Sequence, residues 1–341
     1  MIFLAIKFAF CTAVILFCGK RVAKYGDIIA EKTGLGGLWI GVVLVSVATS
    51  LPELFTGIGS TVFINAPNLT VGNLFGANTY NLVNIALLDF LNKGAPLLSV
   101  ISKGQLLTAV LSLVPLSLAV LGILFGSNTP GMSFANISLF SVLILASYLI
   151  SARMIFKFEK KQQKILREIR KEEKIVFKYD AISLSKASIY YAIFALMIAG
   201  AGVWLAYIGD DLARFLGLSQ NFIGSLFLGF ATTLPEITVS IAALRLGAKE
   251  LAVANMVGSN LFNITIIFLN DVLYRKAPIF AVLAKQNIFT AFIVVLMTIT
   301  LIAGLILKPK KKTILGISAY SIILIGIFLI GAYVNFILGN K

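Results

Sequence analysis

Ten stretches of this sequence are apolar over about 20 residues each, the length that a helix needs to cross the hydrocarbon core of a bilayer. The chain of 341 residues is 59% hydrophobic and only 13% charged, a composition outside the range of soluble domains. The stretches are continuous rather than alternating, which disfavours a β-barrel. We therefore predict an all-α polytopic membrane protein whose transmembrane helices lie near residues 2–22, 37–63, 70–91, 105–125, 133–155, 188–208, 221–246, 251–272, 287–307 and 313–338.

The net charge of +15 indicates a membrane topology rather than a nucleic-acid partner. Most of the 29 Lys and Arg follow odd-numbered stretches, and the positive-inside rule places such connections in the cytoplasm. These residues are Lys20, Arg21, Lys24, Lys32, Lys93, Lys103, those from Arg153 to Lys178, Arg245, Lys249, Lys308 and Lys310 to Lys312. Both termini are then expected outside the cell. The basic linker 156–180 is expected in the cytoplasm, as a solvated helix or a flexible connector.

Thiolate and imidazole ligands are scarce or absent in this chain. The two cysteines, Cys11 and Cys18, are seven residues apart in the first apolar stretch, which suits ordinary packing and predicts neither a disulfide framework nor a thiolate metal site. There is no histidine. Any ion site must therefore be built from oxygen.

The second half of the sequence repeats the first. The segment SVATSLPELFTG (46–57) aligns with GFATTLPEITVS (229–240), and VGNLFGANTYNL (71–82) aligns with VANMVGSNLFNI (253–264). The match extends upstream into the first apolar stretch. We therefore expect that stretch to belong to the mature protein rather than to be a cleaved signal peptide.

Each half contains five apolar stretches. Because this number is odd, the second half must begin on the opposite side of the membrane and cross it in the opposite direction. Inverted repeats of this kind are typical of secondary transporters, whose substrate site lies near the midplane where the halves meet. We predict a first five-helix repeat over 1–155, a linker over 156–180 and a second five-helix repeat over 181–341.

Each repeat places one carboxylate beside a proline in the middle of an apolar stretch: Glu53 follows Pro52, and Glu236 follows Pro235. A charged side chain at the bilayer centre costs roughly 2.5 to 3.5 kcal/mol on insertion scales, and proline removes a backbone hydrogen bond. One such pair could be a tolerated kink. Its duplication across an inverted repeat favours an ion site.

Neutral oxygens accompany the two carboxylates. Hydroxyls flank them, and the next apolar stretch in each half adds amides: Ser46, Thr49, Ser50, Thr232, Thr233, Asn73, Asn78, Asn81, Asn255, Ser259, Asn260 and Asn263. A single Asn often only joins helices. Together these groups form the oxygen-rich set that hard cations such as Ca²⁺ prefer. Two carboxylates balance the charge of one divalent or two monovalent cations.

Four aspartates also recur between the halves, near the ends of the predicted helices: Asp27, Asp89, Asp210 and Asp271. At the membrane interface a charge is well tolerated. We expect these residues to act on helix ends electrostatically rather than to bind the transported ion.

The duplicated motifs resemble those of the sodium/calcium exchanger branch of the cation/calcium antiporter superfamily. ATSLPEL with GNLFGANTYN, and ATTLPEI with GSNLFN, are similar to that family's two α-repeat motifs, near 41–85 and 224–267 here. The resemblance covers nearly the whole chain. It implies a fold of ten helices in two inverted five-helix repeats, with the first and sixth helices as a sliding pair.

The resemblance also implies ligand roles. Glu53 and Glu236 would be the central ligands shared by Ca²⁺ and Na⁺. The other implied ligands are carbonyls for Ca²⁺ at Thr49 and Thr232, oxygens for the sodium sites at Ser50 and Thr233, and further carbonyls at Ser46 and Gly229.

Two positions depart from the family pattern. Asn263 stands where relatives usually carry an acidic residue, and it mirrors Asn81. Ala77 stands where many relatives carry a hydroxyl, although its mirror position keeps Ser259. We include Asn81, Asn263 and Ser259 in the predicted metal site. With one fewer carboxylate, the sodium stoichiometry and the coupling ion stay open.

The sequence thus predicts an antiporter, not an enzyme, that exchanges Ca²⁺ for Na⁺ by alternating access in the plasma membrane. It needs no cofactor beyond the transported ions, and we expect a monomer whose partners are those ions and the bilayer. A proton-coupled Ca²⁺ exchanger is the nearest alternative, although such relatives usually show a Gly-Asn-Ala/Thr-x-Glu motif. An intramembrane protease would need a Ser with a His or two midspan Asp residues. This chain has no His, and its Asp residues lie near the ends of the predicted helices, which disfavours that class. A passive channel rarely needs inverted, paired carboxylates.

Overall fold

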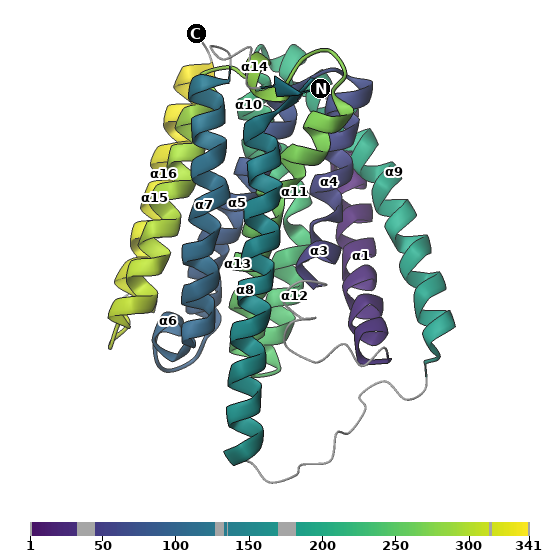
Figure 1. The fold of residues 1–341 in the computed structure, drawn as a ribbon. Coiled ribbons are helices and arrows are strands. Elements are labelled where there is room, and N and C mark those ends of the chain that lie inside the picture. Colours follow the sequence, from purple (N-terminus) through teal and green to yellow (C-terminus); the bar gives the residue numbers. More distant parts are fainter. Residues whose placement is uncertain are drawn as a thin grey trace.

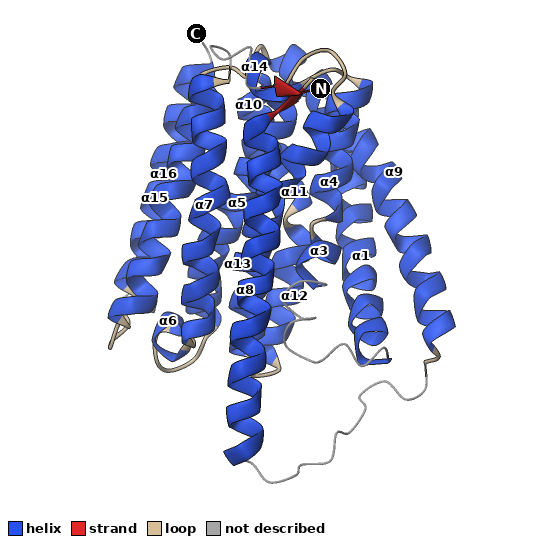
Figure 2. Cartoon of the chain, viewed as in Figure 1, coloured by secondary structure: helices blue, strands red, loops and turns tan. Residues whose placement is uncertain are grey.

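The computed structural model describes residues 2–32, 45–126, 133–134, 136–169, 182–313 and 316–339, which form a bundle of nearly upright helices (Figure 1). Both chain termini are marked at the same end of the bundle, which we call the terminal face. At the opposite end, the linker face, α8 (Leu139–Ile169) ends and α9 (Leu184–Leu216) begins. The only strands among the described residues are β1 (Ser133–Phe134) and β2 (Ile137–Ser138), a small hairpin at the terminal face (Figure 2).

The α-helices of the two halves follow the same order, but the described π-helices stand at different places in that order. The first half contains α1 (Ile2–Lys32), α3 (Ser46–Thr49), α4 (Leu51–Ile58), the π-helix η2 (Gly59–Phe63), α5 (Pro67–Leu91), α6 (Leu97–Val100), α7 (Lys103–Phe125) and α8. The second half contains α9, α10 (Gln220–Ile223), the π-helix η4 (Gly224–Leu228), α11 (Gly229–Thr232), α12 (Leu234–Arg245), α13 (Lys249–Leu273), α14 (Ile279–Val282), α15 (Gln286–Leu307) and α16 (Ala319–Gly339).

Among the described residues, seven helices are long and apolar enough to cross a membrane, and the bent segment from α10 to α12 is an eighth. The helix α5 has 25 residues, as long as these, but it is richer in amides. The broken segment α3–α4–η2 precedes it. These ten segments confirm the predicted all-α polytopic fold.

Three helices extend beyond their predicted ends. The helix α1 continues to Lys32, and α9 runs from Leu184 to Leu216. The helix α8 continues to Ile169, so the predicted linker begins as a helix. The reason is that an apolar stretch marks only the hydrocarbon depth, whereas Lys, Glu and Ala beyond it still favour helix. Residues 170–180 of the linker and 37–44 of the second predicted stretch lie outside the described residues.

The helices α1 and α9 pack along each other at one side of the bundle (Figure 1). Two glycines let this pair approach the centre. A Cβ on Gly19 would lie 2.5 Å from Cβ of Pro235, and a Cβ on Gly202 would lie 3.0 Å from Cβ of Phe55. Each of these helices therefore rests directly on the broken helix of the other half.

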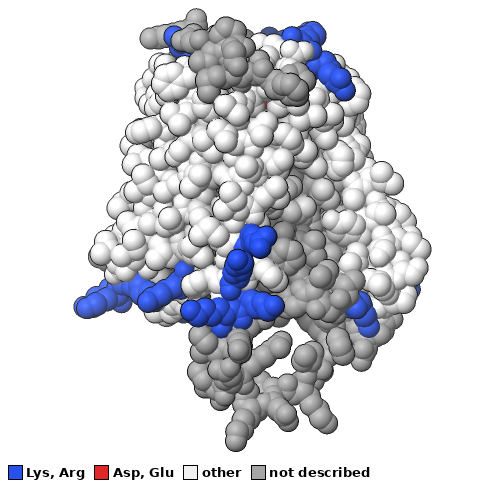
Figure 3. Space-filling view, viewed as in Figure 1, with Lys and Arg blue, Asp and Glu red and all other residues white. Residues whose placement is uncertain are grey.

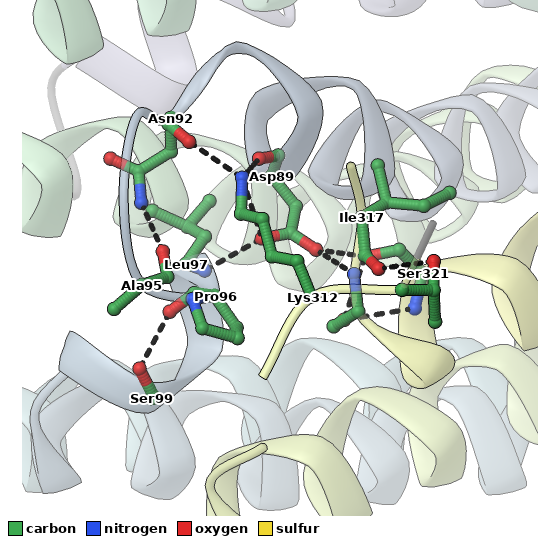
Figure 4. A network of polar contacts seen from close by, with 11 residues as sticks. Asp89, Asn92, Ala95, Pro96, Leu97, Ser99, Lys312, Ile317 and Ser321 are labelled. Carbon is green, nitrogen blue, oxygen red and sulfur yellow. Dashed lines mark hydrogen bonds and ion pairs between the residues drawn. The ribbon is translucent and has the colours of Figure 1, made fainter. Parts of the chain in front are cut away.

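Asp89, at the end of α5, joins the first half to α16 (Figure 4). Its Oδ1 accepts a 2.7 Å hydrogen bond from the backbone N–H of Leu97. Its Oδ2 accepts 2.7 Å bonds from the N–H of Ser318 and the hydroxyl of Ser321, just before and within the first turn of α16. Lys312 donates to the carbonyl of Asp89 at 2.5 Å. One carboxylate thus serves the starts of two helices, α6 and α16.

Asp271 makes the equivalent contacts at the other end of the bundle. Its Oδ1 accepts from the N–H of Ile279 at 2.6 Å, and its Oδ2 accepts from the N–H of Ser138 at 2.8 Å. The predicted helix-end role therefore holds for both aspartates. Both carboxylates are buried, since Asp89 and Asp271 are 0% and 1% exposed. Backbone donors, one from each half, replace the water that a surface carboxylate would have.

Candidate cation-binding site

Both repeats break at the predicted place. The helix α3 ends at Thr49 and α4 begins at Leu51, while α11 ends at Thr232 and α12 begins at Leu234. A proline occupies the first turn after each break. Proline has no N–H, so the helix cannot continue its hydrogen-bond pattern through this point. In the second half the two parts are bent by 40°.

Each break aims a carboxylate into the protein interior. Glu53 and Glu236 lie in the first turns of α4 and α12, where the helix dipole favours an anion. Both are 0% exposed. Their burial is therefore costly unless a positive charge compensates it.

The two carboxylates differ in their hydrogen bonds. Oε1 of Glu236 accepts a 3.1 Å bond from the hydroxyl of Ser50. Its Oε2 and both oxygens of Glu53 have no partner among the described residues. No described Lys or Arg pairs with either side chain. Three carboxylate oxygens are thus available to a bound cation.

Four amides join α5 to α13 at the centre of the bundle. Asn78 donates to the carbonyl of Asn260 at 3.2 Å, and Asn260 donates to the carbonyl of Asn78 at 3.2 Å. The amide nitrogens of Asn81 and Asn263 donate to the side-chain oxygens of Asn260 and Asn78, at 3.0 and 3.1 Å. The buried side-chain oxygens of Asn81 and Asn263 have no hydrogen-bond donor among the described residues.

The threonines before each break are held by amides of the other half. Thr49 Oγ1 lies 3.3 Å from Oδ1 of Asn255, and Thr232 Oγ1 lies 3.2 Å from Oδ1 of Asn73. Ser259 also lies near this group, with its Oγ 3.5 Å from Thr49 Oγ1. Asn73 and Asn255 were named with the oxygen-rich set but not among the predicted ligands. Their contacts indicate that they position the threonines.

The remaining predicted residues lie in the same helices. Ser46 donates to the carbonyl of Asn255 at 3.3 Å, and Thr233 donates to the carbonyl of Gly229. Gly229 packs on α5, where a Cβ would lie 2.9 Å from the backbone N of Ala77. All predicted site residues are therefore buried around the two breaks and the α5–α13 contact. Their individual roles as ligands stay predictions.

The chemistry of this donor set suits a hard cation. No cluster of three or more His, Cys, Asp or Glu occurs in the described ranges, so the site combines only two carboxylates with neutral oxygens. Orphaned carboxylate and amide oxygens are unfavourable in a dry interior, and a bound Ca²⁺ or Na⁺ would satisfy them.

Comparisons with known proteins agree with this description. A sequence profile described as sodium/calcium exchanger protein matches residues 3–155 and 186–340. The chain is 24% identical over 266 residues to the inner membrane protein YrbG of Escherichia coli (strain K12), covering 74% of each chain. It is 25% identical over 270 residues to the sodium/calcium exchanger MaX1 of Methanosarcina acetivorans, covering 72% of this chain and 75% of that one.

The fold is also similar to solved structures. One structure of the sodium-calcium exchanger NCX_Mj superposes with a TM-score of 0.60 over 98% of each chain, at 20% identity. This likeness concerns the fold, whereas the sequence profile covers most of the chain and identifies the family. The chain is therefore an integral membrane transporter, not an enzyme, and it belongs to the sodium/calcium exchanger protein family of cation/calcium exchangers.

Proposed function

We propose that the protein is a secondary antiporter that exchanges Ca²⁺ for Na⁺ by alternating access. Membership of the family supports cation/calcium exchange. The observation that carries the proposal is the pair of buried carboxylates, Glu53 and Glu236, with three oxygens unpartnered among the described residues. Two negative charges balance one Ca²⁺ or two Na⁺, so either ion can occupy the site but not both together.

The neutral oxygens favour sodium over the proton as the coupling ion. A proton needs only a carboxylate oxygen. A sodium ion needs several further ligands, and the buried oxygens of Asn81 and Asn263, which have no donor among the described residues, can supply them. The alternative, a proton-coupled exchanger, would use the same two carboxylates, because protonation also removes the cost of burying their charge.

The sides of the membrane are part of the proposal. Basic side chains gather toward the linker face in the view of Figure 3, with a smaller group at the terminal face. The positive-inside rule then assigns the linker face to the cytoplasm and the terminal face to the outside. We place the protein in the plasma membrane as a monomer. Its two repeats, over 1–155 and 181–341, are joined by the linker 156–180. Ca²⁺ would leave the cell as Na⁺ enters.

The test is uptake of ⁴⁵Ca²⁺ by proteoliposomes under separately imposed Na⁺ and H⁺ gradients. We expect an outward Na⁺ gradient to drive uptake and an H⁺ gradient of equal size, without Na⁺, to drive little. Glu53→Gln at equal protein content is the control for leak. Uptake driven by H⁺ alone would favour the alternative. Uptake that neither gradient accelerates would contradict exchange altogether.

A further inference from the structure

A second group of buried oxygens lies on the terminal side of Glu53. Thr56, Ser60 and Asn270 are all 0% exposed. The hydroxyls of Thr56 and Ser60 and the amide oxygen of Asn270 have no partner in the part of the chain that the structure describes. None of them was predicted from the sequence. Unpartnered polar atoms at this depth are uncommon, and each calls for a physical explanation.

These oxygens continue the line of the central site. Thr56 and Ser60 follow Glu53 by three and seven residues in α4 and η2, so the three share one helix face. At 1.5 Å per residue, Thr56 lies about 4.5 Å and Ser60 about 10 Å along the axis from Glu53. The segment then reaches the loop before α5 at the terminal face (Figure 1).

Gly57 brings α5 and α13 to this face of α4. A Cβ on Gly57 would lie 2.9 Å from Nδ2 of Asn270 and 3.4 Å from Cγ2 of Thr70. Nδ2 of Asn270 donates a 2.9 Å hydrogen bond to the carbonyl of Ile266. The amide oxygen of Asn270 has no donor among the described residues. Thr70 donates to the carbonyl of Gly57 at 3.2 Å. Three helices thus meet around a group of neutral oxygens.

The other repeat shows that the fold does not require these polar groups. The positions equivalent to Thr56 and Ser60 are Val239 and Ala243, and the position equivalent to Asn270 is Leu88. Ala243 and Leu88 are buried, and they belong to the main apolar core. Apolar side chains therefore pack adequately at the mirrored place. At these three pairs of described positions, the polar member of each pair lies on the side between the central site and the terminal face.

We propose that Thr56, Ser60 and Asn270 form a relay site for a monovalent cation travelling between the terminal face and Glu53. This inference rests on the proposed sodium-coupled exchange. The three oxygens are neutral, so they can replace part of the hydration shell of Na⁺ but cannot balance the charge of Ca²⁺. A site without a carboxylate holds its ion weakly, which suits a position that an ion must leave.

The test replaces the three residues by those of the other repeat, as Thr56→Val, Ser60→Ala and Asn270→Leu. The matched control is Thr298→Val with Thr300→Val in α15, where both hydroxyls donate to carbonyls of their own helix, at 2.7 and 2.9 Å. Membrane vesicles of each orientation give the Na⁺ concentration for half-maximal Ca²⁺ exchange at each face. Equilibrium binding of ⁴⁵Ca²⁺ to the purified protein reports on the central site.

In the triple variant we expect the half-maximal Na⁺ concentration at the terminal face to rise about tenfold, equivalent to about 1.4 kcal/mol. The value at the linker face, the equilibrium binding of Ca²⁺ and the control variant should stay at wild-type levels. An unchanged value at the terminal face would mean that the oxygens hold only water, and it would overturn the relay. An equal rise at both faces would also overturn it, because the effect would then act through the central site.

Single substitutions and the reverse substitution test the same relay independently of the triple variant. If the triple variant does not fold, Thr56→Val and Ser60→Ala are measured singly, and each should raise the terminal-face value alone. The reverse change, Val239→Thr with Ala243→Ser, should lower the half-maximal Na⁺ concentration at the linker face, and no change there contradicts the relay. Absence of Na⁺-driven exchange in the wild type is a different failure. It refutes the proposed function before the variants are compared.

Discussion

The hydroxyl of Ser50 donates a 3.1 Å hydrogen bond to Oε1 of Glu236, so the break in the first repeat contacts the carboxylate of the second. The relationship is not reciprocal. Thr233, which is equivalent to Ser50, donates to the carbonyl of Gly229 in its own segment. Glu53 consequently has two unpaired oxygens where Glu236 has one. Equivalent residues of the repeats therefore meet the cation unequally.

Ser50→Ala should destabilise the cation-free protein more than Thr233→Ala does. Ser50→Ala leaves a second oxygen of Glu236 buried without a donor, which costs about 1–3 kcal/mol. Ca²⁺ should stabilise this variant more than the wild type, because the ion replaces the lost donor. Thermal unfolding in detergent, with and without Ca²⁺, measures both effects. Equal losses in the two variants without Ca²⁺ would contradict the asymmetry.

Glu53→Gln and Glu236→Gln should each lower Ca²⁺ exchange by about a hundredfold or more, since removing one partner from a buried ionic site costs about 3 kcal/mol or more. Both variants should remain folded, because an amide fits the space of the carboxylate. The measurement is ⁴⁵Ca²⁺ exchange at matched protein content, with size-exclusion chromatography as the check on folding. Wild-type rates in either variant would exclude a two-carboxylate site.

Asn263→Asp should raise the number of Na⁺ exchanged for each Ca²⁺. With an amide at this position, the empty site carries two carboxylates, and more than about two Na⁺ would repel one another by several kcal/mol at short range. Wild-type exchange should therefore be close to electroneutral. Uptake against an imposed membrane potential measures this in both proteins. A steep voltage dependence of the wild type, in the direction of three or more Na⁺, would show that Asn263 does not limit the stoichiometry.

Single cysteines at the exposed positions Asn65 and Leu246, in the loops just before α5 and α13, should react from opposite sides of the membrane. The cysteines are introduced into a variant that lacks Cys11 and Cys18, which are buried and form no disulfide in the structure. Inversion of the repeats, with the positive-inside rule, places the first loop outside and the second in the cytoplasm. A membrane-impermeant thiol reagent, applied to intact and to everted vesicles, distinguishes the two sides. Labelling of both loops from one side would contradict the inversion.

Asp89→Asn should lower the free energy of unfolding by about 2 kcal/mol, because hydrogen bonds to a charged group are worth about 1.5–3 kcal/mol. An Asn offers one oxygen in place of two to the N–H groups of Leu97 and Ser318. Asp210→Asn is the matched control, since its ion pair is with Arg214, whose side chain is 76% exposed. Denaturant unfolding in detergent gives both values, and similar losses would argue against a special role for Asp89.

Much of this fold follows from the sequence, because apolar length and internal repetition are directly visible. The duplicated Pro-Glu pairs likewise predicted where both helices break. The connections between halves could not be predicted. A repeat shows which residues are equivalent, but it does not show that Asp89 would bind the start of α16 rather than that of α8. The unpartnered oxygens of Thr56, Ser60 and Asn270 were not predicted, because an isolated Thr or Ser in an apolar stretch usually donates a hydrogen bond to a carbonyl of its own helix.

The reciprocal bonds between Asn78 and Asn260 have a consequence for how the chain is assembled. Each residue donates to the carbonyl of the other at the same distance, 3.2 Å, as at the two-fold axis of an isologous dimer. The two halves therefore present self-complementary surfaces at this seam, the contact between α5 and α13. The residues that form the contact all belong to the repeats, and none belongs to the linker. The linker between them acts as a tether that raises the local concentration of one half around the other. Two half-length chains made separately would carry all the groups needed to rebuild this seam.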